Sequence, residues 1–268
     1  MPETLPADLA RALDAPERMA PFGHPVHYFS ETGSTNDVAA RLAERGAPEG
    51  TTVIAAAQTA GRGRLGRDWF SPADAGLYVS VICRNAAAAP HLTLAGGVAV
   101  ADGIRLSTGL PVEIKWPNDV IVDDGRGPAR RRKLAGVLVE ASSDAGGFQY
   151  VVLGFGVNLR PSAYPPAIAS RATSLETELG RPVDGALLLA GILETLAEHF
   201  RALAAGTPRP LLARWRELAP TACGAAVMFE TADGRQRGVT AGIGDDGALL
   251  VRVGERTERV IAGEILWT

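Results

Sequence analysis

The chain has 268 residues, of which 46% are hydrophobic, and its formal net charge at pH 7 is -3. A chain of this length buries about three quarters of the surface that its unfolded form exposes, so its core requires neither disulfides nor a structural metal ion. Residues 1–21 contain acids and prolines where a secretory signal has a basic start and an apolar run, and no later window is apolar enough to span a membrane. We therefore expect a cytoplasmic protein that keeps Cys83 and Cys223 reduced.

Strand and helix signals alternate along the first part of the chain. Ser34 or Thr35 is a suitable N-terminal cap for apolar residues at helical spacing, and Gly46 stops that pattern. Runs of β-branched and apolar residues predict strands, and an Ala- and Gly-rich segment predicts a buried helix. The expected elements are a helix over 34–46, strands over 51–59 and 76–84, a helix over 92–106, and strands over 112–124, 133–142 and 148–159.

Two helices and a series of short strands complete the chain. The apolar residues of 185–204 share one helical face with His199, which we expect to be at least partly buried, and a second helix is expected over 210–218. Short β runs separated by turn signals then follow over 226–230, 238–243, 248–253 and 259–265. The expected fold is α+β: a mixed β-sheet with helices over residues 1–219, then a small SH3-like barrel over residues 220–268 that packs on it.

Residues 61–69, GRGRLGRDW, place three arginines and three glycines in one short segment after a predicted strand. The pattern matches GxGxxG, but the following RDWFSP favours extended backbone over the helix that a dinucleotide-binding turn must open. The next strand also ends in Arg84, where that fold has an acidic ribose-binding residue. We therefore expect a mobile, cationic lid that closes over an anion and excludes water from it.

Only two of the 27 lysine and arginine residues are lysines, Lys115 and Lys133. Lysine provides a compact point charge where the planar fork of arginine does not fit, so both residues indicate tight phosphate or carboxylate sites. Lys115 belongs to the segment KWPND, in which Asp119 could hold Mg²⁺ against phosphate oxygens. The same segment also suits an ordinary turn between two strands.

Neutral polar side chains accompany these charges. Ser34, Thr35 and Asn36 stand at the start of a predicted helix, and Gln58 stands at the end of a predicted strand. None of them titrates near neutral pH, so together they suit the polar but uncharged head of a ligand. The lid arginines and Lys133 would then serve a carboxylate or phosphate on the same ligand.

Five segments occur in the order STN, GRGRLGRDWFSP, KWPNDV, KLAGVLVE and GFGVNL. In sequence and spacing they resemble biotin protein ligases, the enzymes that attach biotin to the carrier domains of carboxylases, most strongly over residues 32–158. The resemblance implies a catalytic domain like that of class II synthetases, with biotin and ATP as substrates and Mg²⁺ as cofactor. The valerate carboxylate of biotin would attack the α-phosphate of ATP to give biotinyl-5′-AMP, and a lysine of a biotin carboxyl carrier domain would then displace AMP.

The resemblance also implies which residues act. The charged groups near the reacting atoms would be the catalytic ones: Lys133, Lys115, Asp119 and Arg64. The biotin site would combine polar groups, lid residues and a glycine that permits close approach: Ser34, Thr35, Asn36, Gln58, Arg62, Gly63, Arg64, Lys133 and Gly136. The site for ATP and the adenylate would contain Arg62, Arg64, Trp69, Lys115, Asn118 and Asn158. Trp69 would stack on the nucleotide or simply pack, Gly156 would allow backbone to approach the ligand, and Asp119 would hold Mg²⁺.

The residues leave other functions open. A lipoate ligase or octanoyl transferase of the same superfamily would have an apolar acyl channel in place of the neutral polar groups. An RNA-binding module would use residues 61–69 and 126–133 as phosphate clamps, but the sequence pI near 5.9 and the lack of stacked aromatics on a strand speak against it. His24 and His27 lack a nearby third ligand for a metal site.

The sequence also bears on partners. Residues 1–31 are too few for the winged helix-turn-helix with which some biotin protein ligases bind DNA, so we expect no DNA binding. Between Asp119 and Lys133 lies a long arginine-rich insertion that either is solvated or contacts an acidic carrier domain. Family members include monomers and homodimers, and the sequence favours neither state.

Overall fold

The computed structural model describes residues 2–123, 131–231, 234–261, 263 and 265–267. Its main feature is a seven-stranded sheet with the order β1-β2-β3-β7-β6-β5-β4. The first two strands pair in parallel and the others are antiparallel, which confirms the expected mixed sheet. The strands are β1 Val26–Phe29, β2 Thr52–Ala55, β3 Gly76–Cys83, β4 Glu113–Lys115, β5 Asp119–Val122, β6 Arg132–Asp144 and β7 Gly147–Asn158.

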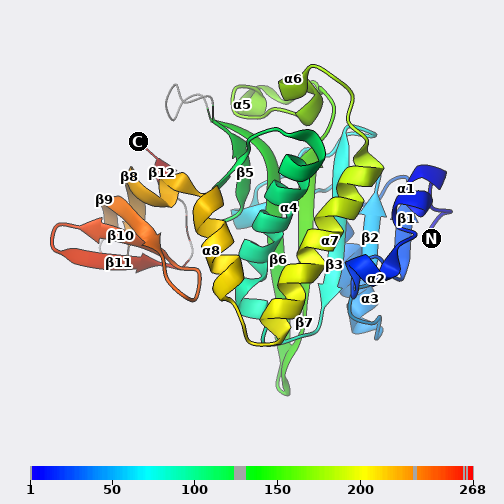
Figure 1. The fold of residues 1–268 in the computed structure, drawn as a ribbon, viewed down its shortest axis with the longest axis horizontal. Helices are drawn as coiled ribbons and strands as arrows, with labels where there is room; N and C mark the ends of the chain where they lie inside the picture. The colour runs from blue at the N-terminus through cyan, green and yellow to red at the C-terminus, as the bar shows by residue number, and fades with distance from the viewer. Residues whose placement is uncertain (1, 124–130, 232–233, 262, 264, 268) are drawn as a thin grey trace.

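Helices α4 (Leu92–Thr108), α7 (Gly185–Ala204) and α8 (Arg209–Leu218) lie on one face of this sheet (Figure 1). The small residues of α4 let it fit between β6 and α7, because a Cβ at Gly103 would lie only 2.5 Å from Ile192 Cγ1. The short N-terminal helices α1 (Ala7–Ala12) and α2 (Pro16–Met19) pack against α7. The three predicted helices 92–106, 185–204 and 210–218 are thus confirmed, with small differences at their ends.

The opposite face of the sheet is covered in part by helix α3 (Thr35–Glu44). Its apolar side forms a separate cluster that includes Val38 and Ala39 of the helix and Val152 of β7. Arg84, at the end of β3, donates from Nη2 to the carbonyl oxygens of Ala43 at 2.7 Å and Ala47 at 2.8 Å, which satisfies backbone acceptors at the helix C-terminus. The cap anchors α3 at one end of this face.

The polypeptide between β7 and α7 contains helices α5 (Pro166–Ala169) and α6 (Leu175–Leu179). It pairs with the start of β6, because Lys133 N donates to Arg171 O at 2.6 Å and Thr173 N donates to Lys133 O at 3.0 Å. Of the arginine-rich insertion, residues 124–130 lie outside the described residues. At its described end, Arg131 Nε lies 2.7 Å from Asp123 Oδ2 and Arg132 Nη2 lies 3.0 Å from Glu178 Oε2.

The C-terminal residues form a second, five-stranded sheet with the order β11-β10-β9-β8-β12. Its residues Val227 and Phe229 belong to the same hydrophobic core as the main sheet, and Trp116 Nε1 donates to Gly247 O at 3.1 Å. Figure 1 shows this sheet at one end of the molecule and the N-terminal helices at the other. The strands are β8 Cys223–Thr231, β9 Gly234–Ile243, β10 Leu249–Val253, β11 Arg256–Val260 and β12 Ile265–Trp267, and the short 3₁₀ segments are η1 Arg64–Gly66, η2 Ala89–His91 and η4 Pro220–Ala222.

Two predicted strands are each divided in the structure. The segment 112–124 forms β4 and β5, which pair with each other around the Trp116–Pro117 turn. The predicted strand over 259–265 contains the end of β11 and the first residue of β12, which lie at opposite edges of their sheet. Among the helices of the described residues, none is long and apolar enough to cross a membrane.

Candidate active site

A floor of glycines lies on the part of the sheet that α3 leaves uncovered. Alternate residues of a strand face the same side, and on β7 Gly154 and Gly156 share their side with Ser80 of β3, whose hydroxyl contacts α3. Gly136 of β6 pairs with Gly156, so two glycines adjoin across the strands. Because these residues lack side chains, the backbone itself forms the bottom of a hollow, and the pocket found there is lined by all three glycines.

Trp69 covers this glycine floor. A Cβ at Gly156 would lie 2.4 Å from Trp69 Nε1, and one at Gly136 would lie 3.2 Å from Trp69 Cζ3. Lys133 Nζ lies 5.0 Å from the centroid of the indole, a distance at which a cation interacts with the ring face. The buried Nε1 atom has no hydrogen-bond partner within the described part of the chain. The indole therefore lines the pocket with an apolar ring, while its donor lies unused against the glycine floor.

The lid predicted from GRGRLGRDW is a small hairpin in the structure. Gly63 N donates to Arg67 O at 2.7 Å, and Trp69 N donates to Gly61 O at 2.8 Å. Its tip is a 3₁₀ turn over Arg64–Gly66 with Leu65 at φ 58°. As expected, this segment does not open a helix as a dinucleotide-binding turn would.

Of the cations that line the pocket, Lys133 and Arg64 have different electrostatic surroundings. Lys133 Nζ forms an ion pair with Asp119 Oδ1 at 2.6 Å. Arg64 is half-buried, and Nη1 donates to the neutral Asn118 Oδ1 at 3.3 Å. Burial lowers the pKa of the Arg64 guanidinium below its ordinary value, and the charge of Asp119 opposes this shift only in part. Arg64 is therefore a partly desolvated cation that an anionic ligand would stabilise.

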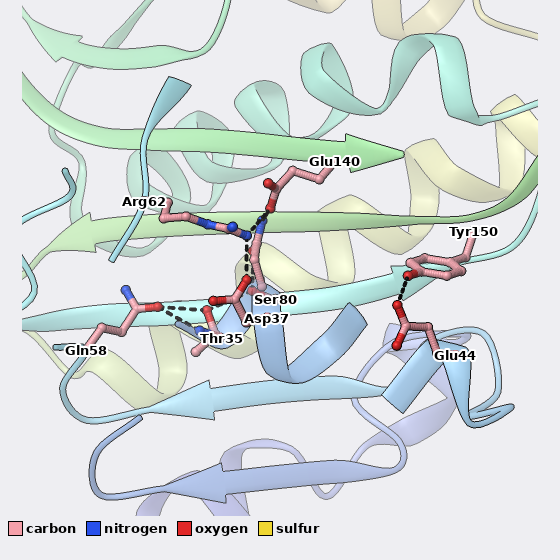
Figure 2. Close-up of polar contacts among 9 residues, drawn as sticks. Thr35, Asp37, Glu44, Gln58, Arg62, Ser80, Glu140 and Tyr150 are labelled. Atoms are coloured by element: carbon pink, nitrogen blue, oxygen red, sulfur yellow. Dashed lines mark hydrogen bonds and ion pairs between the residues drawn. The ribbon is translucent and has the colours of Figure 1, made fainter. Parts of the chain in front are cut away.

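The other side of the pocket contains neutral, hydrogen-bonded side chains (Figure 2). Gln58 Oε1 accepts from Thr35 N at 2.8 Å, while Gln58 Nε2 donates to Ser71 Oγ at 2.9 Å. Ser80 Oγ lies 2.6 Å from Asn36 Oδ1 and 2.8 Å from Thr35 Oγ1. Because the amide oxygen of Asn36 can only accept, the Ser80 proton belongs to that contact, and the one proton of the Thr35 hydroxyl is available to Ser80 Oγ or to Gln58 Oε1 at 3.2 Å.

The structure brings most of the predicted site residues to one pocket. Those that line it are Ser34, Thr35, Asn36, Gln58, Arg62, Gly63, Arg64, Trp69, Asn118, Lys133, Gly136 and Gly156. Asp119 adjoins the pocket through its ion pair with Lys133. Lys115 is the backbone partner of Asp119 where β4 and β5 pair across their turn. Asn158 lies at the end of β7, where its Nδ2 donates to Thr173 O at 2.9 Å.

Four further residues of this region were not singled out from the sequence. Ser80 is the one polar residue near the middle of the apolar strand GLYVSVIC, and that interruption was its available signal. Gly154 stands two residues before Gly156, and this spacing places both glycines on one face of a strand. Asp37 and Glu140 carry no comparable local signal, because only the folded chain brings them to Arg62.

Comparison with known proteins places this chain in one family. The family model described as the biotin/lipoate A/B protein ligase family matches residues 28–158. A biotin–[acetyl-CoA-carboxylase] ligase of Paracoccus denitrificans is 33% identical, over 89% of this chain and 99% of the relative. The chain belongs to the biotin/lipoate A/B protein ligase family.

Within that family, the similarity is to biotin ligases. The Mycobacterium tuberculosis protein named biotin–[acetyl-CoA-carboxylase] ligase is 35% identical, over 88% of this chain and 86% of the relative. The solved structure of biotin protein ligase from Aquifex aeolicus in complex with biotin and ATP superposes with a TM-score of 0.76 at 27% identity, over 91% of this chain and 99% of that one.

Proposed function

We propose that the protein is an ATP-dependent biotin ligase, which activates biotin as biotinyl-5′-AMP and transfers it to a lysine of a biotin carboxyl carrier domain. The observation that carries this proposal is the arrangement of one pocket: a glycine floor with neutral polar groups at one side and Lys133 and Arg64 at the other. A ligand with an uncharged polar head and an anionic tail matches this polarity. Biotin has both, in its ureido ring and its valerate carboxylate.

The first step requires charge compensation more than proton transfer. A carboxylate is ionised at neutral pH, so it attacks the α-phosphorus without a general base, and pyrophosphate leaves as the new acyl–phosphate bond forms. The obstacle is the repulsion between two anions. Lys133 can exchange its contact with Asp119 for the incoming anion, and half-buried Arg64 supplies a second charge where little water screens it.

The neutral side of the pocket favours biotin over lipoate. A ureido group has two N–H donors and one carbonyl acceptor, whereas a dithiolane ring offers no strong donor or acceptor. Thr35, Asn36 and Ser34 are each less than 5% exposed, and they present hydroxyl and amide groups at this side. The hydrogen-bonding capacity that these groups retain can be met by a ureido ring and not by a lipoyl ring.

Asp119 has two proposed roles: it would hold Mg²⁺, and it would orient the acceptor lysine in the second step. Mg²⁺ is held by one or two carboxylates together with substrate phosphates, and Asp119, near the pocket, suits that role. Once Lys133 turns to the ligand, Asp119 can also orient the ammonium of the acceptor lysine, which gives one proton to this carboxylate or to water. The amine then attacks the acyl carbon, the amide bond forms, and AMP departs as the acyl–phosphate bond breaks.

Finer points of the fold and partners also belong to the proposal. The C-terminal sheet is proposed to close as an SH3-like barrel over residues 220–268, attached to a catalytic domain over residues 1–219 that resembles class II synthetases. Cytoplasmic localisation and a lack of DNA binding stay predictions from the sequence, which favours neither a monomer nor a homodimer. So do the roles of Lys115 near the phosphates and of Asn158 near the adenine.

The proposed function predicts a defined mass change on a carrier domain. The protein, biotin and MgATP are incubated with a purified biotin carboxyl carrier domain, and the intact mass of the acceptor is measured. We expect addition of one biotinyl group, with no reaction when lipoate replaces biotin or when the acceptor lysine is replaced by arginine. Lipoylation without biotinylation would instead support the alternative of a lipoate ligase.

Gly154→Ala is expected to weaken biotin binding by about 10- to 100-fold, the size of a typical overpacking penalty. A Cβ at this position would lie 2.0 Å from Asn36 Oδ1, so Asn36 must move out of the neutral side of the pocket. Titration calorimetry with biotin measures the effect. Gly191→Ala is the control, because no side chain or neighbouring element lies within 4 Å of a Cβ there. Equal affinity in the two variants would refute the assigned floor.

A further inference from the structure

The two arginines of GRGR have different surroundings in the structure. Arg64 borders the pocket with a neutral amide as its partner, as described above. Arg62 Nη2 instead lies 2.8 Å from Asp37 Oδ1 and 2.7 Å from Glu140 Oε2. Figure 2 shows the guanidinium of Arg62 between these two carboxylates, one from α3 and one from β6. The positive charge of Arg62 is thus already compensated by the protein, whereas that of Arg64 is not.

One of the two carboxylates is anchored to the sheet. Asn36 Nδ2 donates to Glu140 Oε2 at 2.6 Å, so this oxygen accepts from both Asn36 and Arg62. Asn36 is 4% exposed and its Oδ1 accepts from Ser80, which is fully buried in β3. A chain of contacts therefore leads from the centre of the sheet to the lid hairpin. Glu140 thus has a contact with the sheet-bound Asn36 that does not depend on the lid.

The position of these contacts matters more than their individual strength. The three charged side chains are 41% to 43% exposed, and single ion pairs at such sites contribute little to the stability of a fold. These contacts, however, join the lid hairpin to α3 and β6, so their loss would act on the lid and not on the fold. An amino group of the guanidinium has two protons, so Nη2 can serve both carboxylates at once while the lid is closed.

We infer that Asp37 and Glu140 form a latch for Arg62 and hold the lid hairpin closed over the activated ligand. In this assignment, which rests on the proposed function, Arg62 is a positioning residue that acts through the lid. Arg64 is the lid arginine that contacts the anion. This differs from the role expected from the sequence resemblance, in which both arginines contact biotin and the adenylate.

The inference predicts the same defect from either side of the latch. Arg62→Gln is expected to speed the release of biotinyl-5′-AMP by about 10-fold, the change that loss of a charge-assisted contact produces. The double variant Asp37→Asn with Glu140→Gln should release it equally fast. The triple variant should show no further increase, because each change removes the same interaction. Arg62→Lys should restore slow release in part, since an ammonium can also donate to two carboxylates.

Release is measured by preloading each variant with biotin and MgATP and chasing the labelled adenylate with unlabelled biotin. The thermal unfolding midpoint of each variant should stay close to that of the wild type, as it does for ordinary surface substitutions. This measurement distinguishes loss of the latch from a folding defect. Glu44→Gln is the matched control: Glu44 also lies on α3, but accepts a hydrogen bond from Tyr150 instead of the lid. Its release rate should equal that of the wild type.

If the wild type forms no adenylate, the proposed function itself fails. If the wild type forms it and Asp37→Asn with Glu140→Gln leaves release unchanged or slower, the latch is refuted, since Arg62 would then act directly on the ligand. Additive effects in the triple variant would refute it as well.

Discussion

Lys133→Arg is expected to form biotinyl-5′-AMP about 100-fold more slowly than the wild type, comparable to the loss of one charge-stabilising group in other active sites. Lys133 Nζ stands 2.6 Å from Asp119 Oδ1, and a Cβ at Gly136 would lie 3.0 Å from that nitrogen. Trp69 covers the same place. The larger, planar guanidinium would have to displace the indole or the ligand, so conserving the charge does not conserve the geometry.

The rate is measured as biotin-dependent exchange of pyrophosphate into ATP, which reports the first step without a carrier domain. Arg132→Lys is the control, because it makes a conservative change in the adjacent residue, which pairs with Glu178 instead of facing the pocket. We expect that control to exchange at the wild-type rate. Near-normal exchange by Lys133→Arg would show that a compact ammonium at this position is not required.

Arg64→Ala is expected to release biotinyl-5′-AMP about 10- to 100-fold faster than the wild type, because the substitution removes a charged hydrogen-bond donor to the phosphate. The half-buried guanidinium has a neutral amide as its hydrogen-bond partner, so the adenylate phosphate would be its natural counter-ion. Faster release should also expose the mixed anhydride to bulk lysines. Proteins other than the carrier domain should then become biotinylated.

Both consequences can be measured on the same variant. A chase experiment gives the release rate, and mass spectrometry of an added bystander protein counts its biotinylated lysines. Leu65→Ala is the control, because Leu65 is 63% exposed at the tip of the same lid hairpin. An Arg64→Ala enzyme that keeps its adenylate as long as the wild type, with an unlabelled bystander, would exclude a role for Arg64 in retention.

Long elements could be predicted from the sequence because many residues repeat one signal. The helix over 185–204 has the predicted bounds, and the helix expected over 92–106 ends at Thr108, just before Gly109 adopts φ 78°. Short elements could not. The segment 112–124 is predicted as one strand, although its KWPND also suits a turn, and it contains two strands of three and four residues, too short to show a period of their own.

Site residues could be predicted where they belong to a motif within one segment of the sequence. They could not be predicted where folding brings separate segments together. The lid arginines, Lys133 and the neutral groups at the start of α3 each stand in a recognisable motif, and they line one pocket. Asp37 and Glu140 are 103 positions apart in numbering, and they meet Arg62 only because α3 lies over β3 and β7 while β6 pairs with β7. Charge compensation of Arg62 is therefore a property of the tertiary structure.

The most direct test of the account is a crystal structure with biotin and a non-hydrolysable ATP analogue bound. It should place the ureido ring among Ser34, Thr35 and Gln58, with Lys133 Nζ and Arg64 within hydrogen-bonding distance of the carboxylate or α-phosphate oxygens. A structure in which the ligands lie elsewhere, while Lys133 still pairs with Asp119 and Arg64 points into solvent, would contradict it.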